Sequence, residues 1–382
     1  MPRDPQDELL ALQEAHLLRQ LRPVDSPQAT ELIIDGSRFI NFSSNDYLGF
    51  SSHPEILNAY KNGLNHWGSG SGSSRLVCGT LRPHLELEER LAQLKNSAAA
   101  LTFSTGYATA LGTITALATK GDILILDKLC HASLIDGARL SGATLRIYPH
   151  NDLNRLESHL QWANKKIADD GRIIVITESV FSMDGDLCPL KEIVSLKQQY
   201  GALLLLDEAH AFGIARQGIG LADDLGLSDQ VDLQMGTLSK ALGLSGAYLC
   251  ASRAFIDLLI NRSRSFIYST APPAATAVAA LKAIDILLSE DGQQRRKKLK
   301  QHIKQVTDEI KTIPHSASPI LPYILGSSQD ALQLSSQLYQ QGLLIPAIRY
   351  PTVPRDQARL RITLSAAHSG EQVQQLINAL KT

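Results

Sequence analysis

Short apolar runs alternate with amphipathic stretches through the middle of the chain. From about residue 98 onward, runs of strand length recur at residues 99–103, 123–126, 144–148, 173–177, 203–206, 233–235 and 247–250. Continuous apolar runs of this length are typical of strands that are buried on both faces. The pattern predicts an α/β fold in which a mainly parallel sheet is covered by helices on both faces.

The two ends of the chain have different patterns. Near the N-terminus, leucines at helical spacing predict a helix that Pro23 stops; they are Leu9, Leu10, Leu17, Leu18 and Leu21. Residues 33–40 around Asp35-Gly36 predict a short hairpin. A long helical region is expected over residues 273–312. After it, strands at 320–325, 343–346 and 359–364 mix with helices, which predicts a small α+β C-terminal domain.

The length of 382 residues exceeds what one hydrophobic core usually organises. We therefore expect an N-terminal helix and hairpin segment over residues 1–45, a large α/β domain over 46–275 and a small domain over 276–382. The glycine- and serine-rich residues 68–74 have the composition of a linker, but an active-site loop is an equal alternative.

Composition and charge narrow the class of protein. Lys and Arg total 37 against 38 for Asp and Glu, so no global field favours a nucleic acid or an anionic membrane. The four cysteines form no Cys-x-x-Cys pair, which favours buried reduced thiols over a metal site. Neither a signal peptide nor an apolar run of membrane-spanning length is visible. The expectation is a cytoplasmic enzyme without a metal.

Reactive side chains follow several of the predicted strands, at the carboxyl ends where open α/β sheets bind their ligands. Asp207 and His210 follow one run, Lys240 follows the next, and Glu178 and His131 follow two others. Each residue taken singly has a plain structural explanation, such as a helix N-cap or a solvated charge.

Together these residues match the requirements of pyridoxal 5'-phosphate (PLP). The aldehyde of PLP needs an amine that can form an imine, which a lysine supplies. Its pyridine nitrogen needs a carboxylate to keep it protonated. Its phosphate needs hydroxyls and the backbone N–H groups of a helix N-terminus. The grouping therefore favours a PLP site.

The ordered motifs resemble one family over nearly the whole chain. Asp207-x-x-His210 followed by Thr237-x-x-Lys240 is similar to the fold-type I PLP-dependent transferases, specifically the α-oxoamine synthases. Further matching segments are residues 41–49, 74–76, 104–107, 131–133, 181–186, 207–210, 350–354 and 358–361. The resemblance implies a PLP-dependent acyltransferase with a large PLP-binding domain and a small α+β domain.

The resemblance also implies roles for individual residues around the cofactor. Lys240 would form the imine, Asp207 would face the pyridinium nitrogen, and His210 would bond the phenolic oxygen. His131 would stack on the ring and take part in catalysis and substrate binding. The remaining residues expected around the phosphate are Gly106, Tyr107, Ser182 and Thr237, with Ser269 and Thr270 reaching it from the second subunit of a homodimer.

For the substrates, the resemblance implies that Arg361 binds the amino-acid carboxylate through a bidentate bond. Asn45 also falls on a substrate-binding position, and Arg19 and Thr352 match positions that contact the acyl substrate. Within the family, the segments 150–153, 347–349 and 366–368 most resemble members that condense L-alanine with a pimeloyl thioester. Tyr350 and Cys188-Pro189 are similar instead to members that use glycine, which stay the alternative.

Other classes of protein fit the sequence less well. Asp207-Glu208-Ala209-His210 spells the metal-binding box of a class of helicases, but no Gly-Lys pair is present to bind the phosphates of a nucleotide. A dinucleotide-binding loop at Gly68 lacks its third glycine, since Ser73 stands there. Residues 243–246 lack the spacing of a hydrolase nucleophile elbow. A non-catalytic scaffold is disfavoured because Lys240, Asp207 and both histidines are intact.

Overall fold

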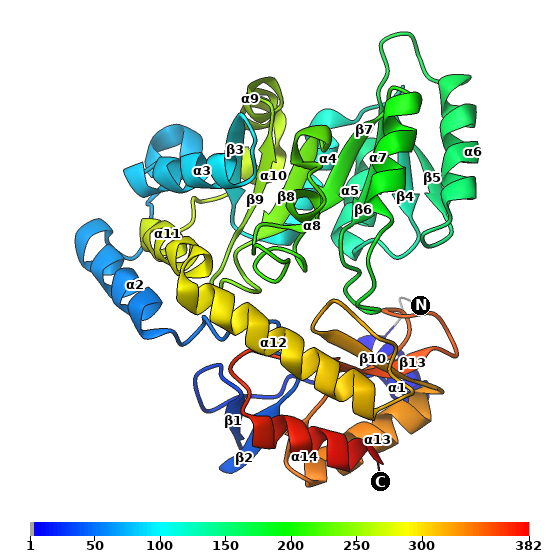
Figure 1. Ribbon diagram of the computed structural model, residues 1–382. Helices are drawn as coiled ribbons and strands as arrows, with labels where there is room; N and C mark the ends of the chain where they lie inside the picture. The colour runs from blue at the N-terminus through cyan, green and yellow to red at the C-terminus, as the bar shows by residue number, and fades with distance from the viewer. Residues whose placement is uncertain (1–3, 382) are drawn as a thin grey trace. The chain divides into compact units, whose positions relative to one another are not determined.

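The computed structural model describes residues 4–381, and its larger compact unit is built on a seven-stranded sheet (Figure 1). The strands lie in the order β3-β9-β8-β7-β6-β4-β5. They are β3 (Ala99–Phe103), β4 (Ile123–Asp127), β5 (Thr144–Tyr148), β6 (Ile173–Glu178), β7 (Leu203–Asp207), β8 (Leu233–Thr237) and β9 (Ala247–Ala251). β9 runs antiparallel to both neighbours, and the other pairs are parallel. The predicted fold class and these strands are confirmed.

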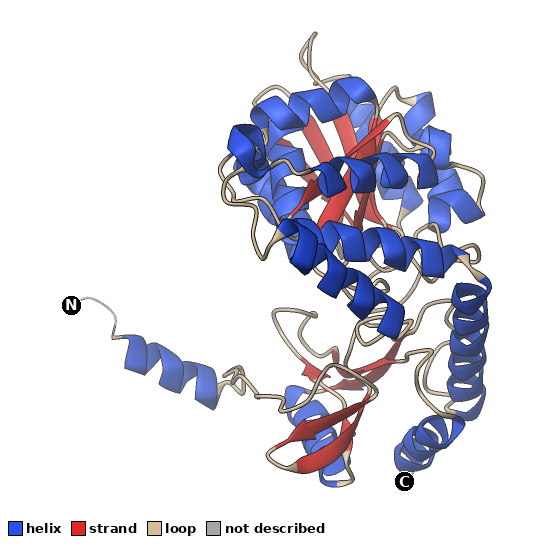
Figure 2. Cartoon of the chain, turned by 90° about the vertical axis from the view of Figure 1, so that its left-hand side faces the viewer, coloured by secondary structure: helices blue, strands red, loops and turns tan. Residues whose placement is uncertain are grey.

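Helices cover both faces of this sheet (Figure 2). Successive side chains of a strand point to opposite faces; accordingly, Leu124 and Leu126 belong to one hydrophobic core, and Ile123 and Ile125 to the other. The first core is closed by α4 (Gly106–Leu117), α5 (Ala132–Ser141), α9 (Arg253–Arg262) and α10 (Arg264–Ile267). The second is closed by α6 (Leu153–Asn164), α7 (Leu190–Gln199) and α8 (Leu221–Asp224).

The long helical region after residue 273 is two helices rather than one. α11 (Ala274–Leu288) ends at Ser289, whose N–H bonds to the carbonyls of Asp285 and Ile286, and α12 (Glu290–Glu309) follows at once. α11 packs against α2 (Pro54–Trp67) and α3 (Arg82–Leu94).

The glycine- and serine-rich segment is not a linker, because it is paired within the larger unit. Ser74 forms an antiparallel bridge with Thr270, and the N–H of Ala271 donates to the carbonyl of Ser73. A π-helical turn over Arg75–Gly79 follows directly.

The smaller unit contains two three-stranded sheets. One has the order β1-β2-β11 and the other β10-β13-β12. Their strands are β1 (Glu31–Ile34), β2 (Ser37–Asn41), β10 (Ile320–Gly326), β11 (Leu343–Leu344), β12 (Ala347–Ile348) and β13 (Ala358–Thr363), accompanied by α13 (Ser328–Gln340) and α14 (Gly370–Lys381). The predicted hairpin is confirmed: Asp35 and Gly36 both have positive φ, as a tight turn between twisted strands requires.

The N-terminal helix is shorter than predicted. α1 (Pro5–Glu14) stops before Leu17, Leu18 and Leu21, because His16 adopts a left-handed conformation with a φ of 55°. None of the residues of α1 is buried.

Each of the two compact units is assembled from more than one stretch of the chain. The smaller unit comprises the chain up to Gly49, Met183–Gly185 and the chain from Lys297 onward, and the larger unit comprises Phe50–Ser182 and Asp186–Arg296. Of the cysteines, Cys78 is exposed, contrary to the expectation of buried thiols, while Cys130, Cys188 and Cys250 are buried. Within residues 4–381, each helix falls short of the length or the apolar character that crossing a bilayer demands.

Candidate active site

Three neighbouring parallel strands of the larger unit end in buried carboxylates. Asp127 closes β4, Glu178 closes β6 and Asp207 closes β7. The register places Glu178 directly opposite Asp207. Burying charged groups is costly unless they are paired, so a cluster of this kind points to a site where charge is used.

The lysine predicted to carry the cofactor lies beside a histidine from the neighbouring strand end. Nζ of Lys240 is 2.8 Å from Nε2 of His210, which is buried. Lys240 follows β8 directly, and His210 follows β7, so the parallel pairing of these strands brings the two motifs together. The spacing of the two residues in the sequence does not predict this contact.

Asp207 lies within electrostatic reach of the same lysine. Its Oδ1 accepts a hydrogen bond of 2.8 Å from the N–H of Ala209. Burial raises the pKa of the Asp207 carboxyl, and the charge of Lys240 acts in the opposite direction. A second cation placed against this carboxylate would also lower its pKa. A charged carboxylate in this position could in turn stabilise a pyridinium.

His131 is held as a neutral ring. It is the N-cap of α5, and its Nδ1 accepts from the backbone N–H of Ser133 at 3.2 Å, so the ring proton lies on Nε2. His131 is exposed as a residue, but partial desolvation of its ring lowers the pKa of this imidazole, and the charge of Asp207 opposes the shift. A neutral aromatic ring held by its own helix start is suited to stacking on a flat ligand.

Glu178 holds the main chain of His131 in place, a role that the sequence alone does not indicate. Its Oε1 accepts the backbone N–H of His131 at 2.5 Å. Burial, reinforced by the neighbouring charge of Asp207, raises the pKa of Glu178 well above its usual value, which favours the neutral acid, while the charge of Lys240 acts against the shift. Its position at a strand end was visible in the sequence, but its register against Asp207 was not.

A buried hydroxyl lies at the start of α4. Thr237 Oγ1 is buried and has no hydrogen-bond partner among the described residues. Thr105 caps α4, and a Cβ on Gly106 would lie 3.0 Å from Cγ2 of Thr237, so this end of the helix adjoins the threonine. The first-turn N–H groups of a helix attract anions. A phosphate there would also give the Thr237 hydroxyl a partner.

The other residues predicted to contact the cofactor lie in the same unit. Ser182 is nearly buried in the segment after β6. Tyr107 points its hydroxyl at Asp136, at 2.5 Å, so any role in binding falls to its backbone. Ser269 and Thr270 adjoin the paired segment at Ser73 and Ser74.

The smaller unit assembles a separate cluster around Arg361. This guanidinium is buried and donates to Thr363 Oγ1 at 2.9 Å and to Asn45 Oδ1 at 3.1 Å. The hydroxyl of Tyr47 also donates to Asn45 Oδ1, at 3.2 Å. Burial raises the pKa of Tyr47 to about 12, while Arg361 acts against the shift. The two predicted substrate residues Arg361 and Asn45 are therefore hydrogen-bonded to one another. Tyr47, which was not among the predicted residues, belongs to the same cluster.

Arg349 interacts with each of the predicted residues Arg19 and Thr352. The backbone N–H of Thr352 donates to the carbonyl of Arg349, at 3.0 Å. Burial lowers the pKa of the Arg349 guanidinium, and the nearby charge of Arg19 adds to the shift. Arg349 also donates to the carbonyl of His16. Like charges held near one another favour an anionic ligand, so Arg349 joins the candidates for substrate binding.

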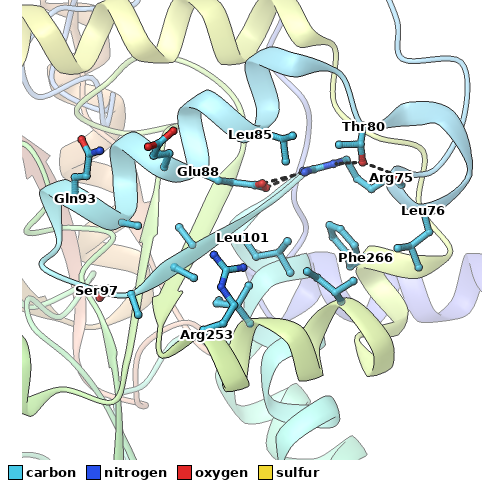
Figure 3. A pocket seen from close by; sticks show the side chains of 17 residues that line it. Arg75, Leu76, Thr80, Leu85, Glu88, Gln93, Ser97, Leu101, Arg253 and Phe266 are labelled. Carbon is cyan, nitrogen blue, oxygen red and sulfur yellow. Dashed lines mark hydrogen bonds and ion pairs between the residues drawn. The ribbon is translucent and has the colours of Figure 1, made fainter.

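A pocket of about 690 Å³ lies elsewhere in the larger unit, along β3, α3, α9 and α10 (Figure 3). Arg75 forms a two-pronged ion pair with Glu88 there, at 2.8 and 3.0 Å. Among the described residues, no predicted site residue lines this pocket. Although this pocket is large, its lining gives no reason to assign the reaction to it.

The comparisons with known proteins agree with this architecture. The profile of the aminotransferase class I and II family matches residues 37–380. An 8-amino-7-oxononanoate synthase of Pseudomonas putida is 45% identical over 372 residues, covering 96% of this chain and 93% of the relative. The serine palmitoyltransferase of Sphingomonas wittichii superposes with a TM-score of 0.91 at 30% identity, covering 98% and 96% of the two chains. A structure of SPT with PLP has a TM-score of 0.90 at 28% identity, covering 99% and 98%.

The fold is that of the fold-type I PLP-dependent enzymes. The predicted resemblance is confirmed at that level. More narrowly, the chain belongs to the 8-amino-7-oxononanoate synthases within the class I and II aminotransferase family.

Proposed function

We propose that this protein is a cytoplasmic, PLP-dependent acyltransferase of biotin biosynthesis. It condenses L-alanine with a pimeloyl thioester, of coenzyme A or of an acyl carrier protein, to give 8-amino-7-oxononanoate, carbon dioxide and the free thiol. The observation that carries the proposal is the contact of Lys240 with His210 next to buried Asp207. Membership of the 8-amino-7-oxononanoate synthases supports the choice of substrates.

The residues present fit PLP. The buried Thr237 hydroxyl, which lacks a partner among residues 4–381, and the adjoining first turn of α4 suit a phosphate. Lys240 would supply the imine nitrogen, Asp207 the charge facing the ring nitrogen, and His210 a bond to the phenolic oxygen. Residues expected to complete the binding are His131 on the ring face, with Ser182 and the backbone of Gly106 and Tyr107 at the phosphate. When bound, PLP supplies an electron sink that stabilises negative charge at the α-carbon of the amino acid.

The chain's own residues handle the protons and the orientation. Nζ of Lys240 removes the α-proton of alanine and later returns a proton to the product. The carboxylate of Asp207 would stabilise a proton on the ring nitrogen of bound PLP. Arg361 holds the alanine carboxylate, because a planar guanidinium bonds a carboxylate through two parallel N–H groups. His131 would stack on the ring of bound PLP.

The acyl substrate brings a carboxylate at its far end. Arg19 and Arg349, held near one another, offer positive charge of the kind that this end requires. The N–H of Thr352 donates to the Arg349 carbonyl, and Asn45 accepts a hydrogen bond from Arg361. We assign Arg19, Arg349 and Thr352 to the acyl substrate and Asn45 to the amino-acid end.

A homodimer is part of the same proposal. Leu76, Val77 and Tyr268 are 52%, 77% and 71% exposed, and they adjoin the paired segments at Ser74 and Thr270. Exposed apolar side chains grouped in this way favour an interface. A second copy placed there would let Ser269 and Thr270 reach its phosphate site. Val77→Asp should then shift the protein from dimer to monomer in analytical ultracentrifugation.

The deciding experiment measures kcat/KM for alanine or glycine with pimeloyl, succinyl, acetyl and palmitoyl thioesters, using one preparation and identifying each product by mass. We expect alanine with pimeloyl thioester to be preferred. One methyl group supplies only about 1–3 kcal/mol of discrimination, so some glycine activity is expected as well. The thioester should discriminate more strongly because of its distal carboxylate. If glycine with succinyl-coenzyme A were preferred, Tyr350 and Cys188 would mark the protein as the glycine-using alternative.

A further inference from the structure

His150 lies between two carboxylates at the same edge of the sheet as the proposed PLP site. It follows β5, while Asp127 ends the neighbouring β4 (Figure 1). Nδ1 of His150 is 3.0 Å from Oδ1 of Asp127, and Nε2 is 2.8 Å from Oδ2 of Asp186. The side chain of Asp127 is fully buried, whereas that of Asp186 is 44% exposed.

This geometry defines the protonation state of the ring. A carboxylate oxygen only accepts, so both ring nitrogens must donate, and an imidazole that donates twice is a cation. Burial lowers the pKa of His150, but the hydrogen bonds to Asp127 and Asp186 outweigh it and raise the pKa to about 10. The ring is therefore a structural cation at neutral pH.

Asp127 connects this cation to the segment that leads to His131. Its Oδ1 also accepts the N–H of Leu129 at 2.8 Å, and its Oδ2 accepts the N–H of Asn151 at 2.8 Å. The carbonyl of Asp127 accepts the N–H of Cys130, the residue before His131. The start of α5, and with it the ring of His131, thus depends on the placement of Asp127.

Asp186 connects the same cation to the segment that carries Ser182. Its carbonyl accepts the N–H of Phe181 at 3.0 Å, and its Oδ2 also accepts from Asn151 Nδ2 at 3.2 Å. The ring of Phe181 meets the His150 ring edge-on, with centroids 4.4 Å apart. Ser182 is the next residue along the chain.

We propose that His150 is a positioning residue that holds the His131 and Ser182 segments in the geometry that binds PLP. The inference rests on the proposed function, because it assumes that these two segments face the cofactor. His150 itself touches neither the cofactor nor the substrates; it acts through Asp127 and Asp186. Neutralising it leaves two carboxylates close together with one donor fewer, and their mutual repulsion displaces the more exposed one, Asp186.

The test compares His150→Gln with a matched control in the same unit. His53, which is buried where His150 is half-buried, also bonds an aspartate, Asp291 at 3.2 Å, but that pair joins neither segment. PLP is removed from each purified protein and added back in a titration followed by absorbance. Thermal unfolding is measured without PLP, and visible circular dichroism is recorded with PLP bound.

We expect His150→Gln to raise the Kd for PLP at least tenfold and to change the dichroism of the bound PLP. His53→Gln should keep its Kd within twofold of the wild type, even where its unfolding temperature falls as much. Equal Kd values for the two variants would overturn the positioning role. Asp186→Asn, which changes the exposed end of the network, should raise the Kd about threefold or more and serves if His150→Gln does not fold; an unchanged Kd there would also overturn the proposal.

The outcome also separates this inference from the proposed function. A wild-type protein that binds PLP, together with His150 variants of unaltered affinity and dichroism, removes the positioning role alone. A wild-type protein that fails to bind PLP removes both.

Discussion

The side-chain nitrogen of Lys240 and Nε2 of His210 are 2.8 Å apart, although the two residues belong to different strand ends. A hydrogen bond needs a donor, so a proton lies between the two nitrogens. This places the proposed base next to a group that can orient it, and beside the buried carboxylate of Asp207.

Replacing the lysine removes the imine nitrogen and the base together. Lys240→Ala should lower kcat by at least about a thousandfold, since it combines the loss of covalent anchoring with that of proton transfer, which alone contributes 10²–10⁴-fold. Product formation is measured by mass spectrometry, and far-ultraviolet circular dichroism checks the fold. PLP should still bind through its phosphate. Turnover near the wild-type rate would exclude Lys240 from the assigned role.

Asp207→Asn tests the partner of the ring nitrogen. An amide of the same shape cannot stabilise a proton on that nitrogen by charge, so the electron sink weakens while binding persists. We expect the exchange of the α-hydrogen of alanine with deuterated solvent to slow by about a hundredfold or more. Nuclear magnetic resonance follows the exchange without the thioester. Exchange at the normal rate would mean that another residue faces the nitrogen.

Glu178 should behave as a neutral hydrogen-bond acceptor. Its raised pKa implies that Glu178→Gln, which keeps an oxygen for the N–H of His131, changes little. We expect kcat within about threefold of the wild type for this variant. Glu178→Ala leaves a buried N–H without its partner, at a cost of about 1–3 kcal/mol, and should lower both kcat and thermal stability. Equal, large losses in both variants would show that the charge of Glu178 matters.

Arg361→Ala should weaken the binding of alanine far more than the binding of the thioester. Losing a charge-assisted pair in a buried site costs on the order of 2–4 kcal/mol, which appears in the KM for alanine. Arg361→Lys is the matched control, because it keeps the charge but not the two-pronged geometry. We expect the KM of Arg361→Lys for alanine to lie between that of the wild type and that of Arg361→Ala. Initial rates with each substrate varied in turn give both KM values, and equal effects on the two would contradict the assignment.

His368 predicts a pH dependence of stability. Its ring is buried, accepts the N–H of Ser365 at 2.9 Å and faces the carbonyl of Asn41 at 3.0 Å, so it is neutral. Burial lowers its pKa to about 4. Because the unfolded chain binds this proton more readily, its contribution to stability is complete above about pH 6.5 and is lost as the pH falls toward 4.

The slope is at most about 1.4 kcal/mol per pH unit from this group. Urea unfolding at pH 7, 6, 5 and 4.5 measures it, and His368→Gln should unfold at lower urea throughout but with a shallower pH dependence. A variant slope equal to that of the wild type would assign the acid sensitivity to other groups.

The sequence by itself determined the secondary structure of the sheet and the chemistry of the site. The apolar runs became strands because a strand buried on both faces must be apolar along its whole length. Lys240, Asp207, His210 and His131 were identified because their motifs are local in the chain. Where local signals compete, the pattern was less reliable, as at α1, whose last predicted turns are absent because His16 leaves the helical conformation.

Only the tertiary structure decided which of these residues meet. Glu178 faces Asp207 through the register of the parallel strands β6 and β7, and His150 joins Asp127 to Asp186 through side-chain contacts between segments that are separated in the sequence. Likewise, Tyr47 and Arg361 converge on Asn45. Register and packing depend on contacts between distant parts of the chain, and burial sets the pKa values of the groups enclosed there. A linear pattern records which side chains are available, whereas their pairing and protonation are properties of the folded chain.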